Sequence, residues 1–430
     1  MQAWSIRGYL AWMFKPLRLL VGQHGTPPAD MLHIPGWETI RLISSHEQLR
    51  DVNRQTGQTY WGGRGNGFLT PLFGVESVFT LDGPWHRIAR RLVSSALTRT
   101  RADQLKPIID EIVRDELDRV EKGRITDAGA LARRITMRVT CLTVLGVTER
   151  PVALRLLKRF DRVTGFLANP VSYNKALWGT LPFPLHVLIN GRIGKVREAI
   201  GTIITTRKAT RMRDGSVADV LICNQQEAGY SDTFIRDNLV ATTAAGYDTN
   251  GSALTWMLFW LSQDGAYSHL LDRCEAVGLD RAADTFISET LRICPPLEIL
   301  PRAVDAEMED GLADGASLVC PCPMRVHHDP ALFENPASFQ AERFDHRTYG
   351  PTEYFPFGAG SRLCLGMNFA SLVMKAVLTE LIARKAFFAL SKRRFQPIRR
   401  NVSLWPGAFN FARLVDWTGD PGSQGIGSTQ

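Results

Sequence analysis

A single cysteine within a glycine-rich loop is the feature of the sequence that points most directly to chemistry. The stretch FPFGAGSRLCLG, residues 355–366, surrounds Cys364 with glycines, which let a backbone turn sharply or approach another group closely. The helical pattern that follows places Cys364 just before or at a helix N-terminus, where backbone N–H groups would stabilise a thiolate. A thiolate is a nucleophile or a metal ligand, so this loop predicts a reactive sulfur.

Three kinds of site could use this sulfur. A cysteine nucleophile needs a histidine base, which the sequence cannot place. A zinc site needs further Cys or His residues at regular spacing, and none lies near Cys364. One thiolate in a glycine-lined loop fits haem iron, because the porphyrin supplies the other four equatorial ligands. Cys320 and Cys322, like the remaining cysteines, are better explained as buried packing residues.

The stretch ATTAAGYDTNG places polar residues inside an apolar helical pattern. Gly246 in mid-helix costs about 1 kcal/mol relative to alanine. Asp248 and Thr249 are expensive to bury unless they are hydrogen-bonded. A capped helix break or a kink with Thr249 bonded back to its own helix would explain the pattern. The functional alternative is a widened helix whose polar pair faces a ligand.

Two further patterns are charged. Glu289 and Arg292 are three apart on one helical face, where an ordinary surface pair would explain them.

His86 and Arg90 are four apart and share a second helical face, while Arg87 and Arg91 lie on another. Either this is a solvated basic helix, or one face binds an anion such as a propionate and the other is exposed.

These residues need a large, mostly helical scaffold. The chain has 430 residues, of which 44% are hydrophobic, enough for a large core. Residues 31–44 alternate around a Pro-Gly turn and predict a hairpin. Helical periodicity dominates from about residue 84 to 265, including some thirty residues after Ser231, or about 45 Å of helix. Short strand and turn patterns follow Pro301.

We therefore predict a mainly α fold with a smaller β portion. One domain would span 1–417, with a β-rich part at about 30–80, a helical body at about 84–300, and strands plus the cysteine loop at 301–417. Residues 418–430 have the composition of a disordered tail.

Composition and charge limit the function classes. The net charge of +8 is spread along the chain, which argues against a nucleic-acid binder and favours a docking face for an acidic partner. Seven scattered cysteines argue against a disulfide framework and for a reducing cytoplasm. Lys15, Pro16 and Arg18 interrupt the apolar N-terminus, so no transmembrane span is expected; a segment lying on a membrane surface is the alternative.

Two motifs look functional but lack the geometry they would need. Residues 62–67, GGRGNG, lack the glycine spacing and preceding strand of a dinucleotide loop. The His327-His328-Asp329 run looks like a metal site, yet adjacent residues on an extended chain point apart.

Taken together, the motifs resemble the cytochrome P450 family, in order and spacing, from the first hairpin to about residue 417. The haem-loop pattern Phe-x-x-Gly-x-Arg-x-Cys-x-Gly is matched by Phe357, Gly360, Arg362, Cys364 and Gly366. The family's Ala-Gly-x-Asp-Thr stretch is matched by Ala245, Gly246, Asp248 and Thr249. Its Glu-x-x-Arg helix is matched by Glu289 and Arg292, with Arg343 as the third partner of that pair. The family's propionate-binding segments are matched by His86, Arg90 and Arg302. The family's Pro-Glu-Arg-Phe region has Ala341 in place of its proline.

The resemblance implies a triangular-prism-like domain of the soluble bacterial type with a b-type haem. Cys364 would be the axial iron ligand. Asp248 and Thr249 would relay protons near the bound oxygen. The residues expected to hold the haem propionates are His86, Arg90, Arg302 and Arg362. A ferredoxin would supply electrons, with Arg87 and Arg91 as candidate docking residues.

The implied activity is a monooxygenase that inserts one atom of O2 into an apolar organic substrate, in natural-product biosynthesis. The pocket residues expected from the family's substrate regions are Phe73, Phe166, Val240, Ala244, Leu300 and Trp405. A peroxide-dependent or isomerising haem-thiolate enzyme is the main alternative, and a non-catalytic haem binder is the other.

Overall fold

The computed structural model describes residues 15–22, 29–32, 39–167, 183–305, 312–313, 315–390, 396–400, 402–407 and 412–419. The predictions made for the first fourteen residues and for the tail beyond 419 lie outside these ranges.

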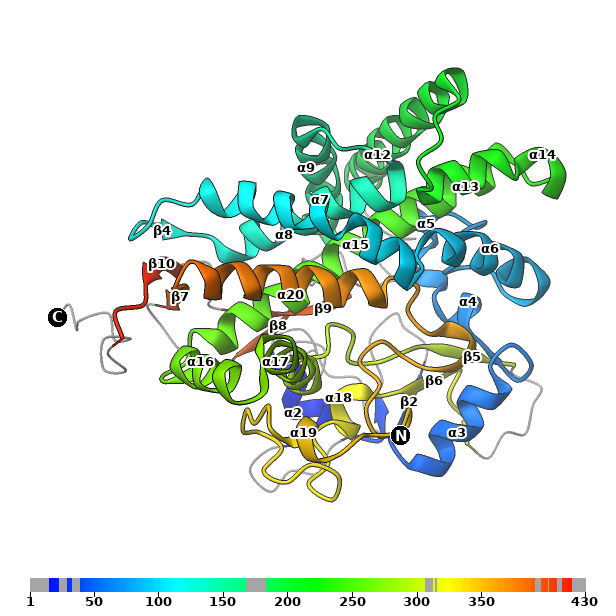
Figure 1. The fold of residues 1–430 in the computed structure, drawn as a ribbon. Helices are drawn as coiled ribbons and strands as arrows, with labels where there is room; N and C mark the ends of the chain where they lie inside the picture. The colour runs from blue at the N-terminus through cyan, green and yellow to red at the C-terminus, as the bar shows by residue number, and fades with distance from the viewer. Residues whose placement is uncertain are drawn as a thin grey trace.

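Helices form most of the described chain (Figure 1). The short ones are α2 (Pro16–Leu20), α4 (Gly62–Gly65), α5 (Thr70–Phe73), α13 (Val217–Cys223), α14 (Gln225–Ala228), α18 (Pro323–Val326) and α19 (Arg343–His346). The longer ones are α3 (His46–Gln55), α6 (Gly83–Ala96), α7 (Arg99–Asp118), α8 (Ala128–Thr140), α9 (Arg150–Leu167), α12 (Phe183–Thr210), α15 (Asp232–Leu261), α16 (Ala266–Val277), α17 (Leu279–Ile293) and α20 (Met367–Ala383). The predicted mainly α fold is confirmed.

Within the described ranges, the strands form three small sheets. The first has the order β1-β2-β6-β5-β3 and comprises β1 (Met31–Leu32), β2 (Ile40–Ile43), β6 (Leu318–Pro321), β5 (Arg302–Val304) and β3 (Tyr60–Trp61). The second has the order β4-β10-β7 and comprises β4 (Ile125–Thr126), β10 (Ala412–Asp416) and β7 (Ala386–Leu390). The third is the hairpin of β8 (Pro397–Arg400) and β9 (Ser403–Pro406).

The predicted N-terminal hairpin is present, since β1 and β2 pair antiparallel with Met31 opposite Arg41. The surrounding stretch is less β-rich than predicted, because α3, α4 and α5 lie between residues 40 and 80.

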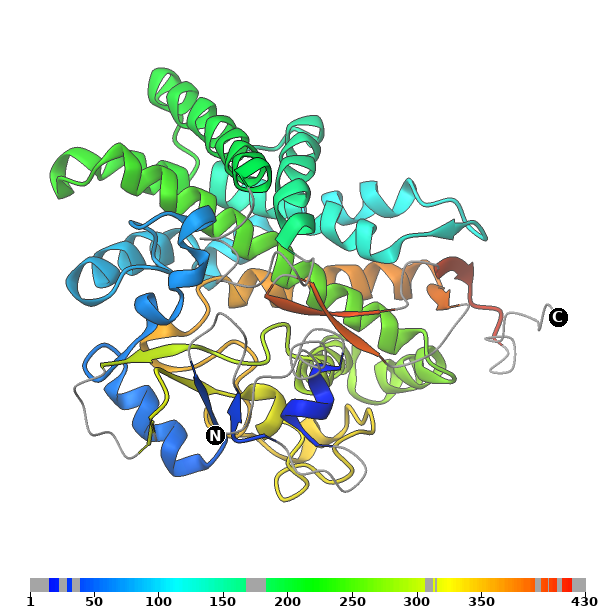
Figure 2. The ribbon, with the colours of Figure 1, turned by 180° about the vertical axis from the view of Figure 1, so that it is seen from behind.

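Helix α15 runs through the middle of the molecule, seen behind α20 in Figure 1 and crossed by the β8–β9 hairpin in Figure 2. It begins where the Ser231 hydroxyl accepts a hydrogen bond from the Phe234 backbone N–H at 2.9 Å, the N-cap that serine favours. It is buried along most of its length within one apolar core shared with α6 to α9, α17 and α20. The apolar run at its C-terminal end is buried, as predicted.

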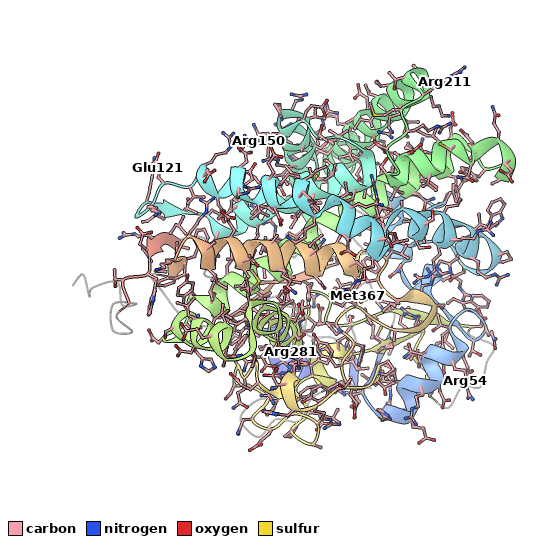
Figure 3. The ribbon with its side chains drawn as sticks, viewed as in Figure 1. Arg54, Glu121, Arg150, Arg211, Arg281 and Met367 are labelled. Atoms are coloured by element: carbon pink, nitrogen blue, oxygen red, sulfur yellow. The ribbon has the colours of Figure 1, made fainter. Side chains whose placement is uncertain are left out.

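Among the described residues, no helix combines the length and apolarity that a bilayer crossing requires. Figure 3 shows the side chains on this scaffold: Arg54 and Arg211 lie at the periphery, and Met367 marks the start of α20 near the centre of the view.

Candidate active site

The cysteine loop turns tightly just before α20. Gly358 and Gly360 adopt φ angles of 73° and 64°, a left-handed region that glycine enters without strain. The Cys364 backbone N–H donates to the Phe357 carbonyl at 2.9 Å, which folds the loop back on itself. Gly366 is the N-cap of α20. Cys364 therefore lies two residues before the helix cap, the position expected from the sequence.

The Cys364 sulfur opens onto an internal cavity of about 360 Å³. The side chain is accessible from that cavity although protein surrounds it on its other sides. Burial raises the pKa of the Cys364 thiol, while the Gly366 N–H and the charge of Arg90 act in the opposite direction. The backbone N–H groups at the start of α20 therefore favour the thiolate, as expected, while desolvation of the sulfur opposes it. A metal bound at this sulfur would displace the thiol proton.

Apolar side chains form most of the cavity wall. Phe73, Ala244 and Leu300 line it, as predicted. Val240 is buried but lies outside the lining, and the side chain of Phe166 falls outside the described residues. The wall is therefore suited to an apolar ligand.

Trp405 does not line the cavity, so that prediction is wrong. Its ring lies near two guanidinium groups, with Arg133 and Arg400 at 5.6 Å and 5.3 Å from the ring centre. These are cation–π contacts. Its indole N–H donates to the Ser403 hydroxyl at 3.0 Å. The reason for the error is that β9 directs this ring toward α8 and α15.

The middle of α15 reaches the same cavity as Cys364. The helix is continuous there, so neither the break nor the widening considered from the sequence occurs. A Cβ atom on Gly246 would lie 2.9 Å from the Thr140 side chain, so glycine permits the close approach of α8. A widened, π-helical turn does occur, but at Cys141–Leu145, directly after α8.

Asp248 and Thr249 both line the cavity, with different hydrogen bonds. The Thr249 hydroxyl donates to the Ala245 carbonyl at 2.8 Å, the back-bonded arrangement considered from the sequence. The Asp248 carboxylate accepts a hydrogen bond from Ser403 at 2.6 Å. Burial raises the pKa of Asp248, and the Ser403 hydrogen bond and Arg400 oppose that shift. The acid is therefore easier to protonate than an exposed aspartate.

The two faces predicted for the basic helix are present on α6. His86 and Arg90 line the cavity, whereas Arg87 and Arg91 are exposed. Burial, then the charges of Arg362 and Arg90, lower the pKa of His86 to about 4. His86 is therefore neutral near pH 7.

Arg302 and Arg362 line the same cavity, and acidic side chains neutralise their positive charges only in part. Arg362 pairs with Asp82 and donates to the Leu81 carbonyl at 2.6 Å. Among the described residues, Arg302 donates to the backbone carbonyls of Leu300 and Pro301 alone, at 3.4 and 2.9 Å. Its buried Nε has no partner in the described chain. Burial, then the charge of Arg362, lower the pKa of Arg302 to about 10.

Among the described residues of this cluster, Asp82 forms an ion pair with Arg362 only, so Arg90 and Arg302 have no paired carboxylate. The donors fit the two carboxylates of a haem, which would form charge-assisted hydrogen bonds with them. The sulfur of Cys364 in the same cavity fits the axial ligand, and the residues present therefore suit the group that the resemblance implies. Phe357 and Gly366 line the cavity as well. Gly360 instead packs against α3, where a Cβ atom on it would lie 3.3 Å from the Asn53 carbonyl oxygen.

The glycines of residues 62–67 serve a purpose that the sequence did not reveal. A Cβ on Gly62 would lie 2.6 Å from the Arg362 side chain, and one on Gly63 would lie 2.5 Å from the Leu81 carbonyl. The Gly63 backbone N–H also donates to Asp82 at 2.8 Å. This glycine segment packs against Arg362 of the cysteine loop. The only sign of that packing in the sequence was the cluster of glycines itself.

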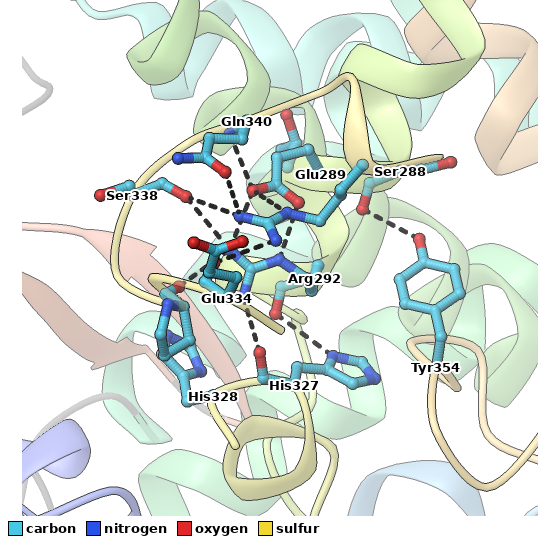
Figure 4. Close-up of polar contacts among 12 residues, drawn as sticks. Ser288, Glu289, Arg292, His327, His328, Glu334, Ser338, Gln340 and Tyr354 are labelled. Atoms are coloured by element: carbon cyan, nitrogen blue, oxygen red, sulfur yellow. Dashed lines mark hydrogen bonds and ion pairs between the residues drawn. The ribbon is translucent and has the colours of Figure 1, made fainter. Parts of the chain in front are cut away.

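Glu289 and Arg292 are both fully buried and form the centre of the polar network shown in Figure 4. Arg292 donates to both carboxylate oxygens of Glu289, at 2.7 and 2.9 Å, and Arg343 donates to the same carboxylate at 3.1 Å. Arg292 also donates to the carbonyls of His327 and Pro336, at 2.6 and 2.8 Å. The ordinary surface pair considered from the sequence is wrong, since both side chains are fully buried.

His327 connects this network to the cysteine loop. Its Nε2 accepts a hydrogen bond from the Phe355 backbone N–H at 3.0 Å, so Nδ1 carries the proton and faces the Arg292 carbonyl at 3.2 Å. Among the described residues, no three His, Cys, Asp or Glu side chains lie close enough together to hold a metal ion. The sequence analysis missed the structural role of His327, which no local pattern announces.

Comparisons with known proteins agree with this geometry. The sequence model described as Cytochrome P450 matches residues 31–269 and 282–408. Putative cytochrome P450 135B1 of Mycobacterium tuberculosis is 27% identical over 401 residues, covering 87% of this chain and 82% of the relative. Abscisic acid 8'-hydroxylase 2 of Arabidopsis thaliana is 27% identical over 335 residues, covering 72% and 67%.

Solved structures share the fold. Retinoic acid bound cyanobacterial CYP120A1 superposes with a TM-score of 0.74 at 22% identity, covering 93% of each chain. The heme domain of cytochrome P450DA gives a TM-score of 0.71 at 19% identity, covering 90% of this chain and 89% of that one. With most of its length matched by the family's sequence model, the chain belongs to the cytochrome P450 family.

Proposed function

We propose that this P450 monooxygenase inserts one atom of O2 into an apolar organic substrate, by hydroxylation, epoxidation or a related oxidation, in natural-product biosynthesis. The observation that carries the proposal is one cavity with mostly apolar walls that contains the Cys364 sulfur, Asp248 and Thr249. The relative named abscisic acid 8'-hydroxylase 2 supports hydroxylation as the reaction type.

The cofactor in this proposal is haem b. When bound, haem supplies the iron that activates O2, with the Cys364 thiolate donating electron density to it. Among the residues that would hold its propionates, Arg302 is the strongest candidate, because the described chain offers its buried guanidinium no carboxylate. Replacing Cys364 with serine should abolish the thiolate-type optical spectrum of the carbon monoxide adduct.

Asp248 accepts and delivers protons in the cavity, and Thr249 holds water beside it. The Thr249 hydroxyl gives its hydrogen to Ala245, so its oxygen acts toward water as an acceptor. Thr249→Ala should divert electrons from product to hydrogen peroxide. Undiminished coupling of electron use to product formation would count against this role.

The electron donor is a ferredoxin, whose acidic surface suits the exposed Arg87 and Arg91 of α6. The seven cysteines of the chain are all free, which supports a reducing cytoplasm as its location.

A spectral binding screen tests the proposed substrate class. Purified haem-loaded protein is titrated with apolar organic compounds, and a shift of the Soret band reports displacement of water at the iron. Apolar compounds should give saturable shifts, while a response confined to charged or small polar compounds would contradict the proposal. Turnover with hydrogen peroxide alone, at the rate seen with reductant, would favour the peroxide-dependent alternative.

A further inference from the structure

Two consecutive hydrogen bonds connect the β8–β9 hairpin to Asp248. The Trp405 indole N–H donates to the Ser403 hydroxyl at 3.0 Å, and that hydroxyl donates to Asp248 Oδ2 at 2.6 Å. An indole nitrogen can only donate, so the Ser403 oxygen is the acceptor in the first bond. A serine has one hydroxyl hydrogen, and its other nearby acceptor, the Arg400 carbonyl, lies farther away at 3.4 Å. The chain therefore runs in one direction, from Trp405 to Asp248.

This direction makes the two oxygens of Asp248 unequal. Oδ2 is occupied as an acceptor in either charge state of the carboxyl group. Within the described part of the chain no donor reaches Oδ1, and Asp248 lines the cavity. A proton that binds this carboxyl group consequently binds at Oδ1, the oxygen without a protein donor.

The hairpin that carries Ser403 is firmly attached to its surroundings. The Leu404 backbone N–H donates to the Pro296 carbonyl at 3.0 Å, and the Leu404 carbonyl accepts from the Trp256 indole at 2.8 Å. The Ser252 hydroxyl donates to the same carbonyl. Because the backbone on which Ser403 sits is fixed from three sides, its hydroxyl holds one orientation of Asp248.

We propose that Ser403 is a positioning residue that keeps Oδ2 of Asp248 occupied and Oδ1 free for proton transfer. Trp405 sets the direction of the Ser403 hydroxyl. The inference rests on the proposed function, in which Asp248 transfers protons. The other titratable or charged groups facing Asp248 come from α8, α9, α15 and β8 and are Arg133, Asp161, Tyr247 and Arg400.

Infrared difference spectroscopy of the full-length haem-loaded protein tests this geometry without turnover. The carbonyl stretch of protonated Asp248 is assigned as the band lost in Asp248→Asn. In Ser403→Ala, loss of the hydrogen bond at Oδ2 should move that band to higher frequency. It should also raise the apparent pKa of Asp248 by about one to two pH units. Ser403→Thr keeps a hydroxyl and should restore both values.

Trp405→Phe keeps an aromatic ring near the two arginines, removes the N–H donor and makes the side chain smaller. It should give a smaller shift of the same band, because Ser403 then loses its preferred direction. A band and a pKa that are unchanged in Ser403→Ala would overturn the proposal.

Turnover provides the second readout. Ser403→Ala should lower the fraction of electrons that reach product several-fold and change the solvent deuterium isotope effect. Ser252→Ala is the matched control, since it removes a hydroxyl that binds the same hairpin without touching a carboxyl group. Equal effects of the two variants would mean that hairpin attachment alone matters, and the proposal would fail. Failure of the proposed function looks different: Asp248→Asn itself would then leave coupling intact.

Discussion

Arg292 and Arg302 are both buried, but the protein surrounds their guanidinium groups very differently. Arg292 faces a carboxylate that it shares with Arg343, together with backbone carbonyls, in the network of Figure 4. Arg302 faces backbone carbonyls and has an Nε atom with no partner among the described residues. The charged neighbour with the largest effect on it is another arginine, Arg362.

This difference in partners distinguishes a buried charge that stabilises the fold, Arg292, from a buried charge that is available to bind a ligand, Arg302. A buried ion pair with its hydrogen bonds completed needs nothing further and holds its elements together. A buried cation without a carboxylate is costly in the isolated chain and becomes favourable only when an anion arrives. Both guanidinium groups are buried, so burial does not distinguish the two regions. They differ in whether a carboxylate neutralises the guanidinium charge.

The largest expected effect lies in the completed network. Glu289→Gln removes the only carboxylate that the described structure offers to Arg292 and Arg343. Leaving buried charge uncompensated should lower the free energy of unfolding by about 3–5 kcal/mol. Denaturant unfolding followed by circular dichroism measures this loss.

Asp110→Asn is the control for that experiment, because it removes one partner of the exposed Lys106–Asp110 pair. An exposed pair contributes at most about 1 kcal/mol. Equal destabilisation by the two substitutions would show that the network is no stronger than a surface pair.

The next largest effect is a dependence of folding stability on pH, caused by His86 in the cavity wall. The pKa of His86 is about 4 in the folded chain against 6.5 for an ordinary histidine. Between these values the unfolded chain binds a proton that the folded chain does not. In haem-free protein, lowering the pH from 6.5 to 4 should therefore reduce stability through His86 by about 3 kcal/mol.

His86→Gln should remove that part of the slope, as seen by subtracting its unfolding curves from those of the unsubstituted protein. The subtraction is needed because burial also lowers the pKa values of His327 and His328. Parallel curves for the two proteins would rule out the contribution of His86.

A third substitution tests the comparison directly. Arg302→Met removes the under-neutralised cation while keeping an apolar stem of similar length. Haem affinity should fall on the order of 10- to 100-fold, as for the loss of one charge-assisted hydrogen bond. Haem-free stability should stay the same or rise. If the haem-free protein were instead destabilised as strongly as Glu289→Gln, the two regions would not differ in kind.

The smallest effect belongs to the exposed face of α6. Neutralising Arg87 and Arg91 together should slow reduction by a ferredoxin by less than about tenfold and flatten its salt dependence. Haem content should be unchanged, in contrast to Arg302→Met. Arg54 on α3, which is also exposed, provides the control substitution. An unchanged rate of reduction in stopped-flow measurements would remove the pair as docking residues.

Local patterns in the sequence predicted features that lie within one element. The spacing of His86 and Arg90 places both on one face of α6, and the Ser231 cap with thirty following residues predicts the extent of α15. The position of Cys364 before α20 followed from glycines and helical periodicity. Each of these depends only on helix geometry and on neighbours along the chain.

The errors concern side chains whose surroundings come from distant segments. Trp405 was expected in the substrate pocket, yet it serves Ser403, which in turn binds Asp248 across 155 positions of sequence. Asp82 and Arg362 meet across 280 positions. Aromatic composition alone did not indicate which way the β8–β9 hairpin would face.

The sequence by itself determined the residues that share a helical face, the loop that presents the cysteine, and the family to which the chain belongs. The tertiary structure alone decided which buried charges are neutralised and which oxygen of Asp248 accepts the Ser403 hydrogen bond. The physical reason is that desolvation and hydrogen bonding depend on every group within a few ångströms, and folding brings those groups together from remote parts of the chain.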